Sequence, residues 1–539
     1  MPETGRWAVA SATTAAPSRQ VRYTDPRTRW LGFALAVLPA LTFLVRVIAA
    51  DSRWRLDLYE DDAYYYLGVA RSIAEGHGST FTGLVETNGY HPLWLGVLVP
   101  LAAAFRDPSH VVVAVAIVQG VLWVWSVREV VRIGRLAGCE TCAAAAVAVF
   151  GVLAVTTGHL AFNGMESALV LPLLLTAVRR IVDTRGRIID DLRLGVVLAL
   201  LCLARLDAAV AAVTLGFVAS VPAGAWSRRD LTTRGIAVAA PPAVALLVYA
   251  VVNVVVFDSV IPVSGRAKGL GAPFLNTEPL TQVLKSGDFD GRSLWFGVVA
   301  LSLVAAAWAT RTWRSDGYRS RLMACTLALV TGEVLLLAYL VTGTSYRVWP
   351  WYHYQVATFS CLATVIVLRW ARDRYGSMAL RMCMVIAVGF LAVQAAVMFR
   401  PEEHAYRGSV EGAEYIQEHT PDDAILAMGD RAGIFGFLSD RPLLQLEGLM
   451  ADVEFLSAMR SGDIASRMIA EGVDYYVHYG PPGQYVKVDG GDCQRFEEPL
   501  QGDGPKSSVV VCDENRVFVA GDVGDRFEIW RFRPELNSG

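Results

Sequence analysis

Long apolar runs constrain this chain more than any other feature of the sequence. Between Leu31 and Phe399, stretches of about 17 to 23 mostly apolar residues recur, and each is long enough as a helix to cross a hydrocarbon core of about 30 Å. Only 18% of the residues are charged and 54% are hydrophobic, whereas roughly 25% are charged in an ordinary soluble domain. The sequence therefore predicts a polytopic α-helical membrane protein and excludes a soluble enzyme.

About eleven segments are candidate transmembrane helices. They are residues 31–50, 109–127, 141–158, 167–183, 194–204, 208–222, 235–257, 294–310, 322–342, 352–368 and 381–399. A further apolar stretch, 91–105, is short and opens with His-Pro. We interpret it as re-entrant, because the segments facing the cytoplasm then carry 24 basic residues and the outward connections only 10. This arrangement predicts a cytoplasmic N-terminus and a C-terminal domain outside the membrane.

The charge is divided unevenly between two parts of the chain. Residues 400–539 hold 13 basic and 26 acidic residues, a formal charge of −13, while the rest holds 35 basic and 25 acidic residues, or +10. An acidic tail beside a basic membrane region fits a tail that lies outside, and it argues against nucleic-acid binding. We expect a disordered cytoplasmic tail over 1–30, a transmembrane region over 31–399 with a large outer loop at 51–108, and an extracytoplasmic α/β domain over 400–539.

The C-terminal region alternates helix-like and strand-like patterns. Helices are expected at 409–419 and 454–472, and strands at 424–428, 443–446, 475–478, 508–512, 516–520 and 527–532. Glycine-containing turns at 429–433 and 446–449 follow strands, as ligand-binding loops often do. Because such turns are common in any α/β domain, we favour a structural role for them. Cys493 and Cys512 are the two cysteines of this region and lie on the oxidising side, so we predict a disulfide between them. The other six cysteines, including the Cys139-x-x-Cys142 pair, are expected to be structural.

The outer loop after the first apolar run contains the most informative motif. Three consecutive acids, Glu60-Asp61-Asp62, precede the aromatic run Tyr64–Tyr66, although neighbouring carboxylates repel one another. One interpretation is that Asp61 or Asp62 caps a helix that ends at Gly76 and Gly78. The other is that one carboxylate acts as a general base while the second positions it or holds a divalent metal. The two roles are compatible.

Basic residues on the outward connections are candidates for binding a phosphate. The chain has no nucleotide-binding signature, so a lipid-linked substrate with its phosphate at headgroup depth is favoured over a sugar nucleotide. The candidates are Arg205, Arg266, Lys268, Arg347 and His353. Each has an ordinary explanation as well: Arg205 can pair with Asp207, and the others can be loop cations or interfacial anchors. Glu166 either caps the next apolar segment or faces the same outer cavity as Asp61.

The order of these motifs resembles the GT-C superfamily of polyprenyl-phosphate-sugar glycosyltransferases. The resemblance rests on the acid pair after the first span, the aromatic helix, Gly76-x-Gly78, and the segment Thr87-Asn88-Gly89-Tyr90-His91-Pro92-Leu93-Trp94. Protein O-mannosyltransferases, aminoarabinose transferases and mycobacterial arabinofuranosyltransferases belong to this superfamily. The chain lacks the Lys-Pro-Pro-Leu segment of the aminoarabinose transferases, which weakens any transfer of substrate identity from them.

The resemblance implies a role for each matching position. Asp61 would be the catalytic base with Asp62 beside it, and Glu166 would match an acidic position of a later outer loop. Arg205, Arg266, Lys268 and Arg347 would hold the donor phosphate, with Asn88, His91 and His353 completing the substrate-binding set. No cofactor is certain; Asp61, Asp62 and Glu166 can hold a divalent cation or act without one, so metal dependence stays open.

The function implied is inverting transfer of a sugar, arabinofuranose or mannose, from a polyprenyl-phosphate donor to a glycan, lipid or protein acceptor. With 44 Arg against four Lys, the composition suggests a GC-rich bacterium, so we expect the reaction on the outer face of a bacterial cell membrane. A transporter or flippase of a lipid-linked sugar is the alternative, although no paired repeat supports it. A receptor that uses only its ectodomain would not need eleven spans.

Overall fold

The computed structural model describes most of the chain. The described residues are 26–143, 145–146, 160–221, 228–277, 317–346, 349–376, 406–480, 485–488, 492–499, 504–521 and 526–537, with the single positions 378, 385, 388, 389 and 392. The predicted spans 294–310 and 381–399, most of the span 141–158, residues 1–25 of the predicted tail 1–30, and Arg347 lie outside the described residues, apart from the single positions named above. Residues 26–30, which the sequence assigns to the disordered tail, are helical instead, because the first helix begins at Pro26.

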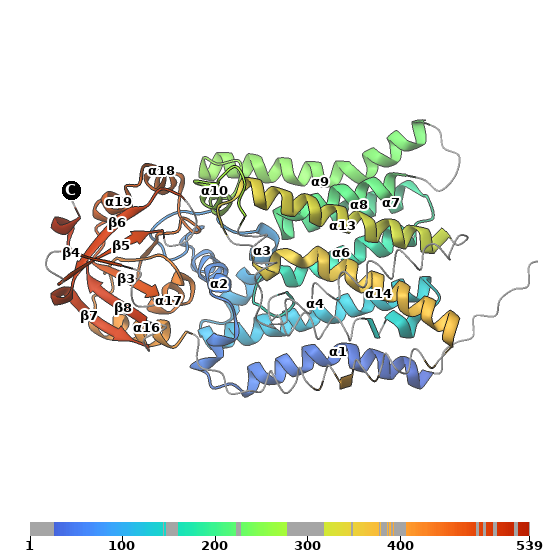
Figure 1. Cartoon of the computed structure of the whole chain (residues 1–539), viewed down its shortest axis with the longest axis horizontal. Helices are drawn as coiled ribbons and strands as arrows, with labels where there is room; N and C mark the ends of the chain where they lie inside the picture. The colour runs from blue at the N-terminus through green and yellow to red at the C-terminus, as the bar shows by residue number, and fades with distance from the viewer. Residues whose placement is uncertain are drawn as a thin grey trace, which may run out of the picture.

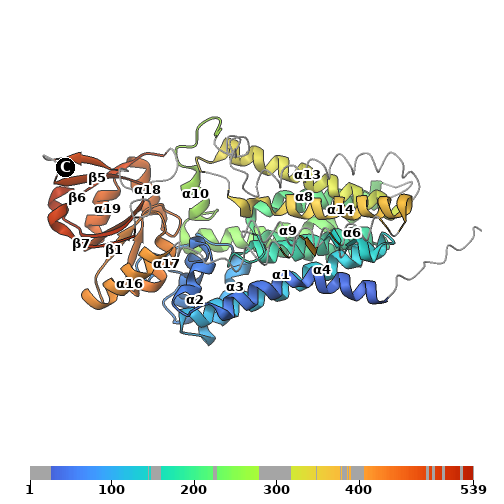
Figure 2. The same cartoon turned by 60° about the horizontal axis from the view of Figure 1, so that its bottom comes forward.

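Long helices lie side by side and form one elongated part of the molecule (Figures 1 and 2). The helices of this bundle are α1 (Pro26–Ala49), α4 (Pro108–Leu136), α6 (Ser167–Val182), α7 (Ile188–Ala204), α8 (Ala209–Ser220), α9 (Arg228–Phe257), α13 (Gly317–Gly343) and α14 (Tyr354–Tyr375). Within the described residues, four helices are long and apolar enough to cross a membrane: α4, α9, α13 and the segment Trp351–Tyr375 that contains α14. These helices begin and end within a few residues of the predicted spans, or extend beyond them.

The apolar run 194–222 is broken where the sequence places its charges. Helix α7 ends at Ala204, a single 3-10 turn, η2 (Leu206–Ala208), follows, and α8 starts at Ala209. Arg205 between them is extended, with φ −156° and ψ 118°. The prediction of two short helices that meet at Arg205 and Asp207 is confirmed.

Shorter elements gather at the end of the bundle that faces the C-terminal domain (Figures 1 and 2). They are η1 (Trp54–Leu58), α2 (Asp61–Ala74), α3 (Pro92–Ala104), α10 (Val263–Gly269) and η3 (Pro350–His353). At 13 residues, α3 is about 20 Å long, which is shorter than a hydrocarbon core. Helix α2 ends before Gly76 and Gly78, whose φ angles of 85° and 84° suit glycine.

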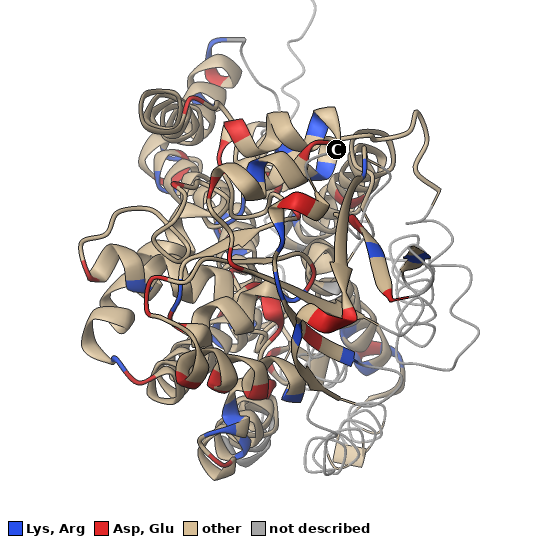
Figure 3. Ribbon diagram, turned by 90° about the vertical axis from the view of Figure 1, so that its left-hand side faces the viewer, with Lys and Arg blue, Asp and Glu red and all other residues tan. Residues whose placement is uncertain are grey.

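The C-terminal domain combines helices with two sheets. Its helices are α16 (Arg407–His419), α17 (Ala432–Ser439), α18 (Val453–Ser461) and α19 (Ile464–Ala470), with 3-10 turns η5 (Asp513–Asn515) and η6 (Pro534–Leu536). Its strands are β1 (Leu426–Met428), β2 (Leu443–Gln445), β3 (Tyr475–Gly480), β4 (Val486–Val488), β5 (Cys493–Glu498), β6 (Ser507–Cys512), β7 (Arg516–Ala520) and β8 (Arg526–Arg531). Figure 3 views this end of the molecule and shows acidic residues spread over helices, strands and loops.

The larger sheet has the strand order β2-β1-β3-β8-β7. Strand β1 pairs in parallel with β2 and β3, while β8 runs antiparallel to β3 and β7. The smaller sheet, β4-β5-β6, is antiparallel. Because β1 and β2 are parallel neighbours, the loops that follow them leave the same edge of the sheet.

The predicted α/β pattern of this domain is largely confirmed, with two differences. The single helix expected over 454–472 is two helices, α18 and α19, because Gly462 adopts φ 71° and ends the first. Helix α17 and strands β4 and β5 were not predicted, since β4 is only three residues long and α17 is a short apolar run without helical periodicity.

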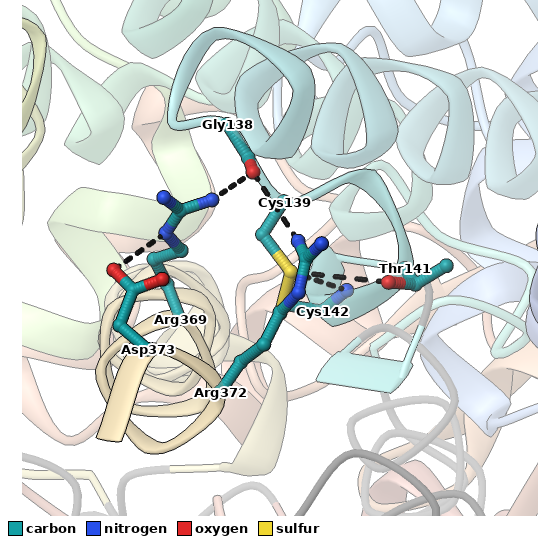
Figure 4. Close-up of a disulfide and its surroundings, with 7 residues drawn as sticks. All are labelled: Gly138, Cys139, Thr141, Cys142, Arg369, Arg372 and Asp373. Atoms are coloured by element: carbon teal, nitrogen blue, oxygen red, sulfur yellow. Dashed lines mark hydrogen bonds and ion pairs between the residues drawn. A yellow bond between two sulfur atoms is a disulfide. The ribbon is translucent and has the colours of Figure 1, made fainter. Parts of the chain in front are cut away.

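Two disulfides are present among the described residues. Cys493 is bonded to Cys512, which lies opposite it on the neighbouring strand. Cys139 is bonded to Cys142, so these two are a bonded pair rather than separate apolar thiols. Figure 4 shows this second disulfide beside Arg369 and Arg372, both of which donate to the carbonyl of Gly138. Cys202, Cys325 and Cys361 are buried free thiols.

Candidate active site

A cavity of about 230 Å³ lies where the short elements at the end of the bundle meet the C-terminal domain. Helix α2, helix α10, Tyr346, the segment 349–351 and two loops of the C-terminal domain all contribute to it. Its lining residues are Glu60, Asp61, Asp62, Tyr65, Lys268, Tyr346, Trp349, Trp351, Tyr406, Asp430, Arg431, Glu447, Leu449 and Tyr479. The cavity therefore combines residues that are nearly 420 positions apart in the sequence.

Asp61 occupies the first position of α2. Glu60, with φ −68° and ψ 151°, is the N-cap residue and makes no side-chain capping bond. The interpretation that Asp61 or Asp62 caps this helix is therefore wrong, because the N-cap position belongs to Glu60, one residue earlier. Both aspartates lie in the first turn, where the helix dipole stabilises negative charge.

The Asp61 carboxylate is held by the C-terminal domain. Its Oδ1 accepts a hydrogen bond of 2.8 Å from the backbone N–H of Ile434, and its Oδ2 accepts one of 2.9 Å from that of Gly433. Both donors belong to the first turn of α17. Burial raises the Asp61 pKa to about 7, against the lowering effect of the Ile434 hydrogen bond. A carboxylate with a pKa near neutrality is well matched to general-base catalysis.

Asp62 lies next to Asp61 in the cavity and interacts with a cation. Burial raises the Asp62 pKa to about 6, and the positive charge of Lys268 opposes this effect. The Lys268 ammonium donates to the Tyr352 hydroxyl at 3.3 Å. The acid pair and Lys268 thus line the same small cavity with opposite charges.

A buried ion cluster lies next to this cavity, at the break between α7 and α8. The Arg205 guanidinium donates to Glu166 Oε1 at 2.6 Å and to both carboxylate oxygens of Asp207 at 2.8 and 3.1 Å. It also lies 4.4 Å from the centre of the Tyr352 ring, whose hydroxyl contacts Lys268. Tyr352 therefore connects Arg205 to the cavity.

The ion cluster around Arg205 is almost completely buried. The side chains of Arg205 and Glu166 are only 3% and 4% exposed. Glu166 occupies the N-cap position of α6, as one interpretation predicts, but its side chain makes no capping hydrogen bond and pairs with Arg205 instead. His91 Nε2 lies 3.9 Å from Glu166, and His91 Nδ1 accepts the backbone N–H of Leu206. His91, the N-cap residue of α3, thus links that helix to the break between α7 and α8.

Asn88 joins three parts of the outer region. Its amide nitrogen donates to Asn253 on α9 at 2.9 Å, and its Oδ1 accepts the backbone N–H of Val263 at the start of α10. Asn88 does not line the cavity, but it fixes the helix that carries Lys268.

Arg266 and Lys268, two of the candidates for binding a phosphate, lie in different surroundings. The two residues are two positions apart on α10, which turns their side chains to different sides of the helix. Arg266 donates to Ser259 at 3.3 Å and is not among the cavity residues, whereas Lys268 is. His353 pairs with Glu333 of α13 at 2.8 Å, also outside the cavity.

The loops 429–433 and 446–449 supply cavity residues that the sequence analysis treated as structural. Glu447 is 3% exposed, and burial, reinforced by the charges of Asp430 and Glu498, raises its pKa well above the usual value. Arg431 lies over the Tyr479 ring at 3.9 Å. The position of both loops after strands was the available signal, but their distance in sequence from Asp61 concealed the contact.

In the part of the chain that the structure describes, no group of three or more His, Cys, Asp or Glu side chains has a metal-binding arrangement. Glu166 is engaged with Arg205, and both Asp61 oxygens accept backbone N–H groups. Asp61, Asp62 and Glu166 therefore do not form a common three-ligand site.

Three solved structures share the fold of this chain. An oligosaccharyltransferase from Archaeoglobus fulgidus is 11% identical over 83% of this chain and 69% of that one, with a TM-score of 0.54. AglB from the same organism, in complex with an inhibitory peptide and a dolichol-phosphate, is 12% identical over 84% and 70%, with a TM-score of 0.50. The arabinofuranosyltransferase AftD from Mycobacteria is 12% identical over 95% of this chain but only 40% of its own length, with a TM-score of 0.50.

These structures are of glycosyltransferases of the GT-C superfamily, and the chain shares their fold. The sequence matches no protein-family model and no curated protein sequence. At identities of 11 to 12%, the likeness concerns the fold.

Proposed function

We propose that this chain is an inverting membrane glycosyltransferase that moves a sugar from a polyprenyl-phosphate donor to an acceptor hydroxyl. The observation that supports this most is the position of Asp61 and Asp62 in one cavity with Lys268, within the GT-C fold. A carboxylate with a pKa of about 7 is suited to accept a proton, and a nearby ammonium is suited to a phosphate.

In the proposed reaction, Asp61 takes the proton from the acceptor hydroxyl. The hydroxyl oxygen forms a bond to the anomeric carbon while the bond from that carbon to the donor phosphate breaks. The electron pair leaves with the polyprenyl phosphate, whose charge Lys268 stabilises, with Arg205 behind Tyr352. The hydrogen bonds from Gly433 and Ile434 leave Asp61 with free lone pairs for this proton.

The proposal extends to the donor, the sugar, the acceptor and the topology in the membrane. AglB is described with a dolichol-phosphate and a peptide, and AftD as an arabinofuranosyltransferase, which supports a lipid-phosphate donor. We favour arabinofuranose or mannose as the sugar and a glycan, lipid or protein as the acceptor. We further propose that the protein lies in a bacterial cell membrane with about eleven spans. Its N-terminus is cytoplasmic and its C-terminal domain lies outside the membrane, and the domain boundaries fall after residues 30 and 399.

The test is transfer of a radiolabelled sugar by the purified full chain in lipid nanodiscs. Polyprenyl-phosphate mannose and polyprenyl-phosphate arabinofuranose are each supplied with an envelope glycan fraction. Asp61→Asn should lose at least a thousandfold in rate while it still binds polyprenyl phosphate. The matched control is Asp107→Asn, because Asp107 is an exposed N-cap of α4 and Asn caps equally well.

Two outcomes would contradict the proposal. Near wild-type transfer by Asp61→Asn would remove Asp61 as the base. Movement of labelled donor across the bilayer in proteoliposomes, without a covalent product from any donor, would favour a transporter.

A further inference from the structure

Two loops of the C-terminal domain form the cavity wall opposite α2. Residues 429–431 follow β1 and residues 446–449 follow β2, so both loops leave the same edge of two parallel strands. They contribute Asp430, Arg431, Glu447 and Leu449 to the lining. Loops at the carboxyl ends of parallel strands are common positions for ligand contacts.

Glu447 has an unsatisfied group inside this cavity. Its side chain is buried, and its Oε2 accepts only a long 3.5 Å hydrogen bond from Gln445. Its Oε1 is buried with no hydrogen-bond partner among the described residues. A buried carboxyl oxygen without a donor is unfavourable, so a ligand that brings a hydroxyl group would stabilise it.

The charge of the cavity excludes one class of acceptor. Five carboxyl groups line it, from Glu60, Asp61, Asp62, Asp430 and Glu447, against two cations. One of the cations, Arg431, is already engaged with the faces of Tyr479 and Tyr406 at 3.9 and 5.1 Å. Those carboxyl groups that are ionised would repel an anionic acceptor, whereas the protonated ones can still exchange hydrogen bonds with hydroxyl groups. Lys268 is the cation that we assign to the phosphate of the donor.

Aromatic rings complete the wall. Trp349 and Trp351 stack with ring centres 5.3 Å apart and an interplanar angle of 5°, and both line the cavity. An aromatic face binds the apolar C–H face of a sugar ring, and carboxyl groups exchange hydrogen bonds with its hydroxyls. A cavity of about 230 Å³ accommodates a sugar residue but leaves little room for a bulky chain.

We propose that the loops 429–431 and 446–449, with Trp349 and Trp351, form the acceptor subsite, and that it takes a neutral, hydroxyl-rich glycan. Glu447 binds one acceptor hydroxyl, which leaves another directed at Asp61. This inference rests on the proposed function and narrows its acceptor to one class.

The test measures binding by isothermal titration calorimetry to the full chain in nanodiscs, without turnover. The probes are neutral manno- and arabino-oligosaccharides, an oligogalacturonate as the anionic analogue, and polyprenyl monophosphate for the donor side. We expect a neutral oligosaccharide to bind at least tenfold more tightly than the anionic analogue. Glu447→Ala should weaken that binding at least tenfold and leave polyprenyl-phosphate binding within twofold.

The matched control is Glu454→Ala, because the Glu454 side chain is 79% exposed on α18, away from the cavity. If Glu447→Ala does not give a monodisperse folded protein, Asp430→Asn serves as the second variant with the same expected loss. Equal or tighter binding of the anionic analogue overturns the inference, as does wild-type affinity in the folded variants.

The two proposals fail separately. If no neutral oligosaccharide binds but labelled sugar is transferred to a peptide or lipid, the glycan acceptor is wrong and the transferase stands. If neutral oligosaccharides bind but no donor is ever consumed, the sugar site stands and the transferase does not.

Discussion

The carboxylate of Asp61 accepts a 2.8 Å hydrogen bond from the backbone N–H of Ile434, 373 residues later in the chain. This contact places the first turn of α17 directly on the proposed base. The C-terminal domain is therefore part of the candidate site and not an appendage to the membrane region. If the contact between Asp61 and α17 matters for activity, changes in the C-terminal domain should affect transfer.

Gly433→Ala should disturb the proposed base without removing it. A Cβ at this position would lie 2.7 Å from Asp61 Oδ2 and even closer to the Asp61 carbonyl oxygen, so α17 and α2 must separate. We expect transfer to fall at least tenfold, with both domains still folded. Gly120→Ala is the control, because nothing lies within 4 Å of a Cβ there, and it should keep wild-type activity. Equal activities of the two variants would show that the contact is dispensable.

The dependence of transfer on pH should report the raised pKa of the acid pair. A base must be ionised, and the Asp61 and Asp62 pKa values are about 7 and about 6 rather than near 4. We therefore expect kcat/KM to rise with pH between about 5 and 8, with little activity at pH 5. A pH–rate profile measured at constant ionic strength checks this. A profile that is already flat above pH 5 would contradict it.

Lys268 and Arg266 provide a matched pair for the donor phosphate. Lys268 lines the cavity, whereas Arg266 contacts Ser259 outside it. Lys268→Gln should weaken polyprenyl-phosphate binding at least tenfold, and Arg266→Gln should change it less than twofold. Calorimetric titration of both variants distinguishes the two residues. The opposite order would mean that the phosphate lies on the other side of α10.

Glu166→Gln should destabilise the fold strongly, because it leaves the buried Arg205 guanidinium with one partner fewer. Removing one member of a buried ion pair costs about 3–5 kcal/mol. Glu414→Gln is the comparison. Glu414 forms an ion pair with Arg53, and these side chains are 48% and 43% exposed, so the pair contributes about 1 kcal/mol or less to the stability of the fold. Thermal unfolding in nanodiscs should show a large drop in Tm for the first variant only.

Replacing both Cys493 and Cys512 by Ser should lower the stability of the C-terminal domain. The disulfide closes a segment of 19 residues, and a crosslink over such a loop contributes about 3 kcal/mol. Hydrogen exchange of β5 and β6 in the full chain would measure the loss. Unchanged protection of these strands would show that the sheet alone holds them together.

Local patterns in the sequence predicted much of the fold and half of the candidate site. The apolar runs, the break at Arg205 and the acid pair at Asp61 and Asp62 are all visible within about 30 residues of context. Helix α2 ends where glycine permits a left-handed backbone, and that signal is local as well.

The other half of the site depends on contacts that no local pattern encodes. Glu447 and Arg431 belong to loops whose composition is typical of any α/β domain, and only the packing of α17 against α2 brings them to Asp61. The same limit applies to Arg266. The sequence makes it a phosphate candidate like Lys268, but the helical path of α10 turns the two side chains apart.

The separation of Asp61 from Gly433 also affects how the protein is made. At about 5–20 residues per second, a ribosome needs roughly 20 to 75 s to add the 372 residues between them. During that interval the nascent membrane region already contains its acid pair but lacks the amide groups that orient it. The newly synthesised chain thus gains a complete centre only after its C-terminal domain has been made and has folded.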